Sequence, residues 1–168
     1  DIEIDKINKP ERVLVKHDIN RWYIIILIIF LFIAGSITAT MLPTLSYNIA
    51  LYIALPGIIL YELIFKKLPF IGNLIISTLV GSVFLYTEAA LTGKIDFTWP
   101  IMILALLLNL IREIIKDMED IDGDNSRNLK TLPIMLGTKK TIWIVRLISL
   151  IFIIASFFSS YPSTSKYF

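Results

Sequence analysis

The sequence has no cysteine, a single histidine and few charges for its 168 residues. Without cysteine the chain cannot form disulfides, thiolate metal sites or cysteine nucleophiles. The lone histidine, His17, excludes multi-histidine metal sites, and we expect it to lie on the surface. Charged residues make up 18% of the chain and apolar residues 56%, whereas soluble domains average about 25% charged residues and just under half apolar ones. The chain is therefore too apolar for an ordinary soluble domain.

Five long apolar runs account for this composition. The first contains no charge and would be about 31 Å long as a helix, which is roughly the hydrocarbon thickness of a bilayer. The runs are apolar on every helical face, unlike amphipathic surface helices. We therefore predict an all-α integral membrane protein, a transmembrane helix bundle forming one domain over residues 1–168. The expected spans are about 22–42, 47–65, 69–91, 99–115 and 141–161.

Basic residues alternate along the segments that flank these runs. The segments before the first run and after the second, together with the end of the fourth run and the segment after it, hold 13 of the 16 lysine and arginine residues. The other flanking segments hold only Lys94 and Lys166. Since basic connections face the cytoplasm, we expect a protein of the cell membrane whose basic face is cytoplasmic. A net charge of +2 gives no reason to expect a nucleic-acid partner.

Nine of the 14 acidic residues fall in two short stretches, residues 1–5 and 113–124. Asp117, Asp120 and Asp124 share one face if a single helix continues that far, although Gly123 is a candidate helix end. Four predicted spans separate the stretches, so both should lie at the cytoplasmic end. Facing carboxylates repel each other unless a cation intervenes, and oxygen ligands with basic neighbours suit Mg²⁺ and a phosphorylated substrate. The sequence therefore predicts one site for Mg²⁺.

Acidic residues next to a membrane helix can also serve purposes unrelated to phosphate chemistry. A single charge run beside such a helix is usually a solvated cap. An EF-hand is excluded because Gly123 is misplaced and Thr131 stands where a glutamate is needed. The sequence also differs from the CDP-alcohol phosphotransferase motif, because the residues that follow Gly123 do not match that motif. A transporter or ion-binding protein would place its site near the bilayer midplane, where Pro56-Gly57 is the only helix break in the sequence.

The two acidic stretches resemble the aspartate-rich motifs of the UbiA superfamily of intramembrane prenyltransferases. Asp1 and Asp5 match the last two aspartates of the first motif. The strings DIEIDKINKPER, IGN at residues 71–73, REIIKDMEDIDGD and TLPIMLG resemble the branch that contains geranylgeranylglycerol-phosphate geranylgeranyltransferase. The resemblance covers essentially the whole chain. Because the family has nine transmembrane helices, the five runs would be the third to seventh, and we expect an internal piece of a longer protein.

The resemblance implies Mg²⁺-dependent transfer of a prenyl group, geranylgeranyl, from an allylic diphosphate to a lipid acceptor. The expected acceptor is geranylgeranylglycerol phosphate, in ether-lipid synthesis. Aromatic or tetrapyrrole acceptors of the quinone, haem and chlorophyll pathways are the alternatives within the family. A membrane transporter is the alternative outside it. Membrane lipid should surround the protein, and the sequence predicts no oligomeric state.

The resemblance also assigns roles to individual residues. Mg²⁺ would be held by Asp1, Asp5, Asp117, Asp120 and Asp124, and the last three would also be catalytic together with Tyr61, whose aromatic face can stabilise a carbocation. Phosphate groups would be bound by Lys66, Lys67, Asn73, Arg112, Lys116 and Lys130. The positive-inside rule explains Lys66 and Lys67 equally well, and an interfacial aromatic belt is the simpler explanation of Tyr61. For Asn73, hydrogen bonding between helices is an equal alternative. Glu88 and Arg146 receive no role.

Overall fold

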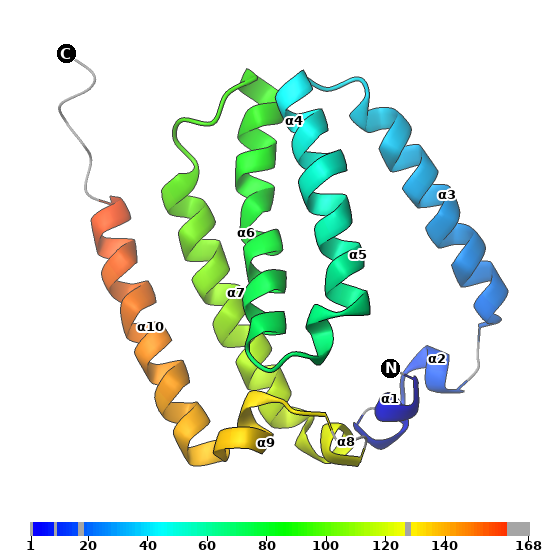
Figure 1. Cartoon of the computed structure of the whole chain (residues 1–168), viewed down its shortest axis with the longest axis vertical. Coiled ribbons are helices and arrows are strands. Elements are labelled where there is room, and N and C mark those ends of the chain that lie inside the picture. Colours follow the sequence, from blue (N-terminus) through cyan, green and yellow to red (C-terminus); the bar gives the residue numbers. More distant parts are fainter. Residues whose placement is uncertain (1, 9, 17–18, 127–128, 161–168) are drawn as a thin grey trace.

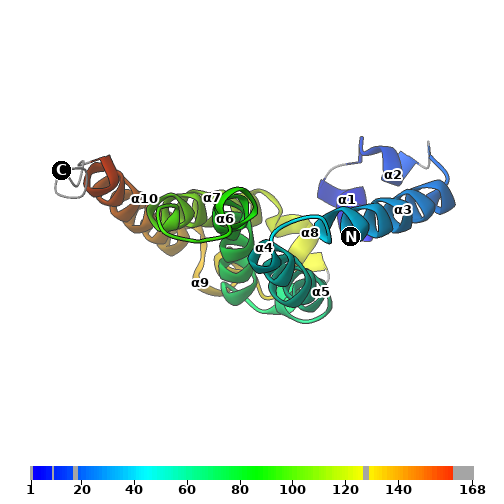
Figure 2. The ribbon, with the colours of Figure 1, turned by 90° about the horizontal axis from the view of Figure 1, so that it is seen from above.

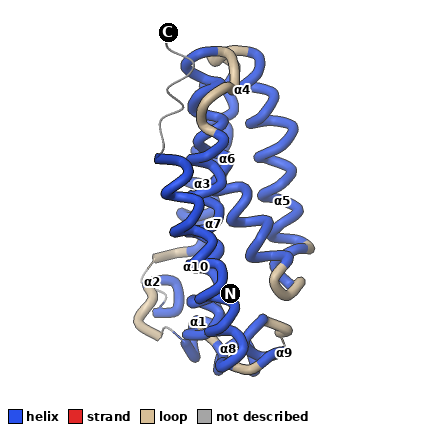
Figure 3. The backbone as a smooth tube through the Cα atoms, turned by 90° about the vertical axis from the view of Figure 1, so that its left-hand side faces the viewer, coloured by secondary structure: helices blue, strands red, loops and turns tan. Residues whose placement is uncertain are grey.

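The computed structural model of the chain describes residues 2–8, 10–16, 19–126 and 129–160. Every regular element in these ranges is a helix, and Figures 1 and 3 show the short helices α1, α2, α8 and α9 gathered below the long ones, with α4 at the opposite end. This agrees with the predicted all-helical membrane fold. The elements are α1 Ile2–Asn8, α2 Val13–Lys16, α3 Arg21–Ala39, α4 Thr44–Asn48, η1 Ile49–Ala54, α5 Leu55–Leu63, η2 Phe65–Lys67, α6 Ile71–Thr92, α7 Trp99–Glu119, α8 Ile121–Ser126, α9 Leu132–Leu136 and α10 Thr138–Ser160.

Four helical segments in the described part of the chain are long and apolar enough to cross a membrane. They are Arg21–Ala39, Thr44–Leu63, Ile71–Thr92 and Thr138–Ser159, and they coincide with four of the five predicted spans. The remaining predicted span, 99–115, falls on α7, which is 21 residues long. Its second half carries Arg112, Glu113 and Lys116, so α7 combines a membrane-length helix with a charged end, and the count of five spans stays a prediction.

The second apolar run forms a continuous helical segment in spite of Pro56. Proline has no N–H to donate and its ring crowds the preceding turn. The chain accommodates it with a π-helix, η1, immediately before α5, in which the N–H of Leu55 bonds the carbonyl of Ala50 five residues earlier. The break expected at Pro56-Gly57 is therefore a local change of helix type rather than an interruption.

The tightest packing joins α6, α7 and α10. Gly81 of α6 lies so close to α7 that an added Cβ would be 2.7 Å from the carbonyl oxygen of Met102. On its other side α7 packs against α10 through Leu110, Ile114 and Ile148, which are all buried. These three helices form the most closely packed part of the described structure, and α7 carries part of the second acidic stretch at one end.

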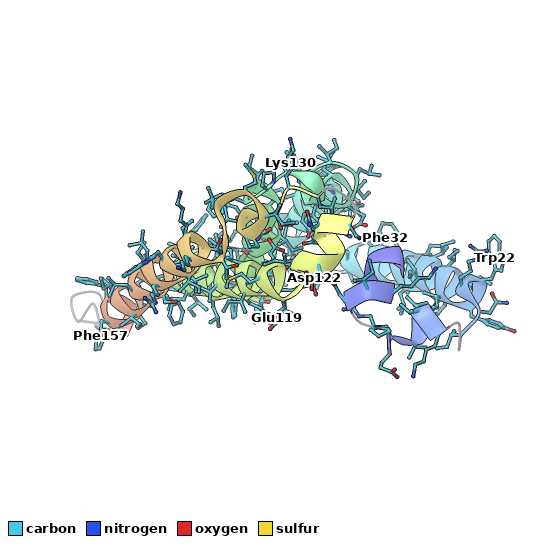
Figure 4. The ribbon with its side chains drawn as sticks, turned by 90° about the horizontal axis from the view of Figure 1, so that it is seen from below. Trp22, Phe32, Glu119, Asp122, Lys130 and Phe157 are labelled. Atoms are coloured by element: carbon cyan, nitrogen blue, oxygen red, sulfur yellow. The ribbon has the colours of Figure 1, made fainter. Side chains whose placement is uncertain are left out.

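The helix α3 has no buried residue although its side chains are almost entirely apolar. Figure 2 shows it at one edge of the molecule. Seen from below in Figure 4, Trp22 on α3 and Phe157 on α10 lie at opposite edges, and they are 64% and 73% exposed. Such apolar faces are costly in water and favourable in lipid or against other membrane helices, which agrees with a membrane-embedded fold.

At the end of the bundle away from the acidic stretches, Glu88 holds the connection between α6 and α7. Its Oε1 accepts hydrogen bonds from the backbone N–H groups of Asp96 and Phe97, each at 2.9 Å. Its Oε2 accepts from the N–H and the hydroxyl of Thr98, at 3.0 and 2.5 Å. The side chain thus satisfies the N–H groups that precede α7, which would otherwise lack partners. Glu88 therefore has a structural role.

Candidate functional site

The two acidic stretches lie together at one end of the bundle. Figures 1 and 3 show α1 beside α8 at the lower end of the molecule, next to the C-terminal end of α7, and these two short helices are in contact. Their neighbourhood was predicted from an even number of membrane crossings. We call this region the acidic end and define it by Asp5, Glu113, Asp117, Asp120 and Asp124. Asp1 lies outside the described residues.

Asp117 occupies the contact between α6 and α7. The side-chain Nδ2 of Asn73 donates a hydrogen bond of 2.8 Å to Asp117 Oδ2. Behind this pair, the Ser77 hydroxyl donates to the carbonyl oxygen of Asn73 at 2.6 Å and accepts from Asn109 Nδ2 at 3.2 Å. This bond between α6 and α7 is the helix–helix hydrogen bond expected as the alternative for Asn73, and phosphate binding by Asn73 stays a prediction.

The helix that carries Asp117 ends earlier than a single acidic face requires. The helix α7 ends at Glu119, Asp120 adopts non-helical dihedral angles, and a separate helix α8 begins at Ile121. The condition for a single shared face, one continuous helix through Asp124, is therefore not met. Gly123 does not end a helix but lies inside α8. The break nevertheless returns Asp124 to within electrostatic range of Asp117 and Asp120.

Burial and mutual repulsion raise the pKa values of two of these carboxyl groups. Asp124 is only 8% exposed, and this burial, with the charges of Asp117 and Asp120, raises its pKa to about 6. Burial is also the main cause of the raised pKa of Asp117, and the Asn73 hydrogen bond opposes it. The negative charges of these neighbouring carboxylates are therefore only partly balanced by positive charges of the protein.

The first acidic stretch reaches the second through an amide rather than a carboxylate. The side chain of Asn8, at the end of α1, donates to the carbonyl oxygen of Asp120 at 3.1 Å and accepts from the N–H of Gly123 at 2.9 Å. Asp5 instead forms a two-oxygen ion pair with Arg12 Nη1 at 2.8 and 2.7 Å. In this arrangement the carboxylate of Asp5 is neutralised by arginine.

The predicted phosphate-binding residues are spread over several surfaces. Arg112 bonds Glu113 at 2.7 Å, Lys116 Nζ is 3.7 Å from Glu113, and Lys66 Nζ is 3.1 Å from Glu62. Lys67 is the last residue of η2. Lys130 is exposed between α8 and α9, and Figure 4 shows it at the same end as Glu119 and Asp122.

Two grooves adjoin the bundle. One of about 740 Å³ has a charged end formed by Arg112, Lys116 and Glu119, and otherwise apolar walls that include Val80 and Leu108. The other, about 670 Å³, is almost wholly apolar and lies between α3, the η1–α5 segment and α6. Its lining includes Ile58, one turn before Tyr61 on α5, and Tyr61 lies within electrostatic range of Glu113 and Asp117. The lining residues belong to the halves of α3 and α6 that lie away from the acidic end, and Ile58 is the lining residue nearest to Tyr61 on α5.

The donor atoms at the acidic end are of the kind that a hard cation binds, but the described side chains do not lie close enough together to form a complete metal site. In the ranges that the structure covers, no three acidic or histidine side chains are close enough to hold one metal ion. The available donors are carboxylate and amide oxygens, which are the ligands that Mg²⁺ prefers, and Mg²⁺ commonly keeps several waters and binds one or two carboxylates together with substrate phosphates. The raised pKa values of Asp117 and Asp124 are what a divalent cation would relieve. The donor atoms therefore fit Mg²⁺ in their chemistry, with substrate phosphates and water needed to complete its coordination.

Sequence reasoning missed Asn8, Ser77 and the structural role of Glu88. An asparagine or serine alone carries no sign of its partner, and the bonds from Asn8 join residues 112 and 115 positions apart. The only available signal for Asn8 was its place directly after the first acidic stretch. A signal for Glu88 was its cost as a charge inside an apolar run.

Comparison with known proteins places the chain in a family. All of residues 1–168 match the UbiA prenyltransferase family. Similar proteins include those named digeranylgeranylglyceryl phosphate synthase from Thermococcus gammatolerans, 38% identical over 94% of this chain and 56% of the relative, and from Haloquadratum walsbyi, 39% identical over 93% and 54%. The one from Methanococcus aeolicus is 39% identical over 86% of this chain and 50% of its own length.

The chain spans about half the length of the curated relatives it matches. No solved structure has significant similarity to it. The family match covers the whole chain, including both acidic stretches, which the structure places together at one end of an all-helical bundle. The chain belongs to the UbiA prenyltransferase family.

Proposed function

We propose that the full-length protein transfers a geranylgeranyl group from its diphosphate to geranylgeranylglycerol phosphate, with Mg²⁺, in ether-lipid synthesis. The observation that carries this proposal is the group of Asp117, Asp120 and Asp124, whose charges interact at the end of a membrane bundle. The names of the similar proteins support the same acceptor.

The reaction breaks the bond between the allylic carbon and the diphosphate oxygen, and both electrons leave with the diphosphate. The acceptor hydroxyl oxygen then bonds that carbon and loses its proton. When bound, Mg²⁺ supplies neutralisation of the diphosphate charge, which makes diphosphate a better leaving group. In our proposal Asp117, Asp120 and Asp124, with Asp5 and Asp1 from the first stretch, hold the metal directly or through water.

The basic residues complete the proposed charge balance. We propose that Lys116 and Arg112 bind phosphate oxygens after exchanging their contacts with Glu113, since hydrogen bonds between ionised groups are strong and short. Lys66, Lys67 and Lys130 are the remaining candidates at this end. For Asn73 we propose a role through Asp117, to which its amide is bonded.

The prenyl chain requires an apolar path beside this charged end. We propose that it follows the apolar groove between α3, α5 and α6. Tyr61 would then lie near the reacting carbon, where its aromatic face can stabilise developing positive charge. The excess of basic residues at the acidic end favours a cytoplasmic active site.

The test is a product assay with the full-length protein in lipid. Geranylgeranyl diphosphate and Mg²⁺ are supplied with either geranylgeranylglycerol phosphate or an aromatic acceptor, and products are identified by mass. We expect an ether-lipid product that disappears with EDTA. A product from the aromatic acceptor alone would overturn the substrate assignment. If no prenyl diphosphate is consumed in a Mg²⁺-dependent way, the proposed prenyltransferase activity is wrong.

A further inference from the structure

The side chain of Asn8 on α1 forms one hydrogen bond to the residue before α8 and one to a residue within α8. Its amide nitrogen donates to the carbonyl oxygen of Asp120, where α7 has ended, and its amide oxygen accepts from the N–H of Gly123, in the first turn of α8. The N–H groups at the start of a helix have no partner within the helix. An asparagine usually satisfies one of them from the adjacent Ncap position. Here the asparagine comes from a helix more than a hundred residues away in the sequence.

Gly123 is fitted to this side chain. A Cβ at Gly123 would lie 2.4 to 2.6 Å from three side-chain atoms of Asn8. The described glycines with positive φ are Gly93 and Gly137, and Gly123 is not among them. Since its backbone does not require glycine, the space taken by Asn8 explains why this position has no side chain. Two stretches that are distant in the sequence therefore fit each other at this point.

We propose that Asn8 is a positioning residue that caps α8 from α1 and sets the spacing between the two halves of the acidic end. This deepens the proposed function and rests on it. Asp5 lies one turn before Asn8 on α1, and Asp124 directly follows Gly123 on α8. A contact made by Asn8 to the backbone on both sides of the α7–α8 break therefore fixes how far one carboxylate lies from the other.

The first measurement is a distance that does not depend on activity. Because the sequence has no cysteine, spin labels can be attached at Ile7→Cys on α1 and Asp122→Cys on α8, two exposed positions. In the full-length protein we expect one narrow distance distribution, which Asn8→Ala broadens. Gly123→Ala should broaden it in the same way, because the added methyl group displaces the end of a flexible side chain rather than backbone.

The double variant makes the test specific. When Asn8→Ala and Gly123→Ala are combined, the distribution should equal that of either single variant, because both remove one contact. Asn8→Asp should broaden it as well, since a carboxylate cannot donate to the Asp120 carbonyl. Additive effects, or a narrow distribution in Gly123→Ala, would overturn the proposal. Asn125→Ala, an exposed asparagine on α8, is the matched control and should leave the distribution narrow.

The second measurement is the Mg²⁺ concentration that gives half the maximal rate. Residues that orient metal ligands typically change metal affinity or activity by about 10- to 100-fold when mutated, so we expect about a tenfold increase in Asn8→Ala and Gly123→Ala, and no further increase in the double variant. An unchanged Mg²⁺ response with a broadened distance distribution would overturn the positioning role. If the wild-type protein consumes no prenyl diphosphate, the proposed function fails, and the distances still decide whether Asn8 joins α1 to α8.

Discussion

At the residue scale, the acidic end combines charges that repel with amides that hold them in place. Asp117 and Asp124 are held close to other carboxylates by Asn73 and by the backbone turn after Asp120. The sequence predicted these aspartates because their spacing and flanking residues matched a known motif. It did not predict the amide contacts, because an asparagine becomes informative only when the fold brings its partner within about 3 Å.

The raised pKa of Asp124 predicts how stability depends on pH. The folded pKa of about 6 lies above the ordinary value for aspartate, so the folded state binds the proton more tightly than the unfolded state. Without divalent cations, stability should therefore fall as the pH rises from about 4 to about 6, and Asp117 acts in the same direction. The measurement is the midpoint of thermal unfolding across this pH range, in EDTA.

Adding Mg²⁺ should reverse this loss at pH 7 and have less effect at pH 5, where protons compete for the carboxylates. Asp124→Asn should weaken the pH dependence, whereas Asp122→Asn, an exposed neighbour on the same helix, should retain it. A midpoint that does not change between pH 4 and pH 7 would contradict this account of the carboxylates.

At the scale of elements, the long helices follow directly from the apolar runs. Their approximate ranges were predictable because a run of about 20 apolar residues has few alternatives in a membrane. The π-helix before Pro56 and the break between α7 and α8 were not predictable in the same way. The first involves a hydrogen bond of the Leu55 N–H within its own helix, and the second involves a bond from Asn8, 112 positions away; a hydrophobic pattern records neither.

The contact of α6 with α7 predicts a large effect of one methyl group. Gly81→Ala would place a Cβ 2.7 Å from the Met102 carbonyl oxygen, and backbone cannot move aside as a side chain can. We expect a loss of about 1–3 kcal/mol in stability, as for other overpacked sites. Gly35→Ala on α3 is the control, because an added Cβ there meets no atom within 4 Å among the described residues. Equal unfolding midpoints for the two variants would contradict this packing.

A substitution of Glu88 should affect the stability of the fold without affecting the proposed chemistry at the acidic end. Glu88→Gln replaces one of the two acceptor oxygens by an NH2 group that can only donate. The N–H groups bonded to that oxygen, either those of Asp96 and Phe97 or that of Thr98, then lose their acceptor. We expect the midpoint of thermal unfolding to fall, because polar groups left without a hydrogen-bond partner destabilise the folded state. Glu88 is remote from the acidic end, so the Mg²⁺ concentration for half the maximal rate should stay unchanged. A shift in that concentration would show that Glu88 acts on the site.

At the scale of the whole molecule, orientation in the membrane follows from the distribution of basic residues. The sequence predicted that the two acidic stretches lie at one end, because four predicted crossings return the chain to its starting side, and the structure brings α1 to α8. The relative placement of Asp5 and Arg12, and of Arg112 and Glu113, was not predictable from composition because it depends on the short helices and side-chain contacts at that end.

Cysteine labelling tests the orientation. The sequence has no cysteine, so Lys94→Cys, in the connection between α6 and α7, and Asp122→Cys, on α8, are unique targets within this chain. In sealed vesicles that keep the cellular orientation, a membrane-impermeant maleimide should label position 94 from outside and position 122 only after the membrane is opened. Labelling of both positions from outside would contradict the topology.

The central claim is that the acidic end binds an allylic diphosphate together with Mg²⁺. The most direct test is binding of a non-hydrolysable geranylgeranyl thiodiphosphate to the full-length protein, with and without Mg²⁺, in wild type and in Asp117→Asn. The account predicts tight binding to the wild type only with Mg²⁺, and binding to Asp117→Asn that is weaker by about tenfold or more. Equal binding in EDTA, or full Mg²⁺-dependent binding by Asp117→Asn, would contradict it.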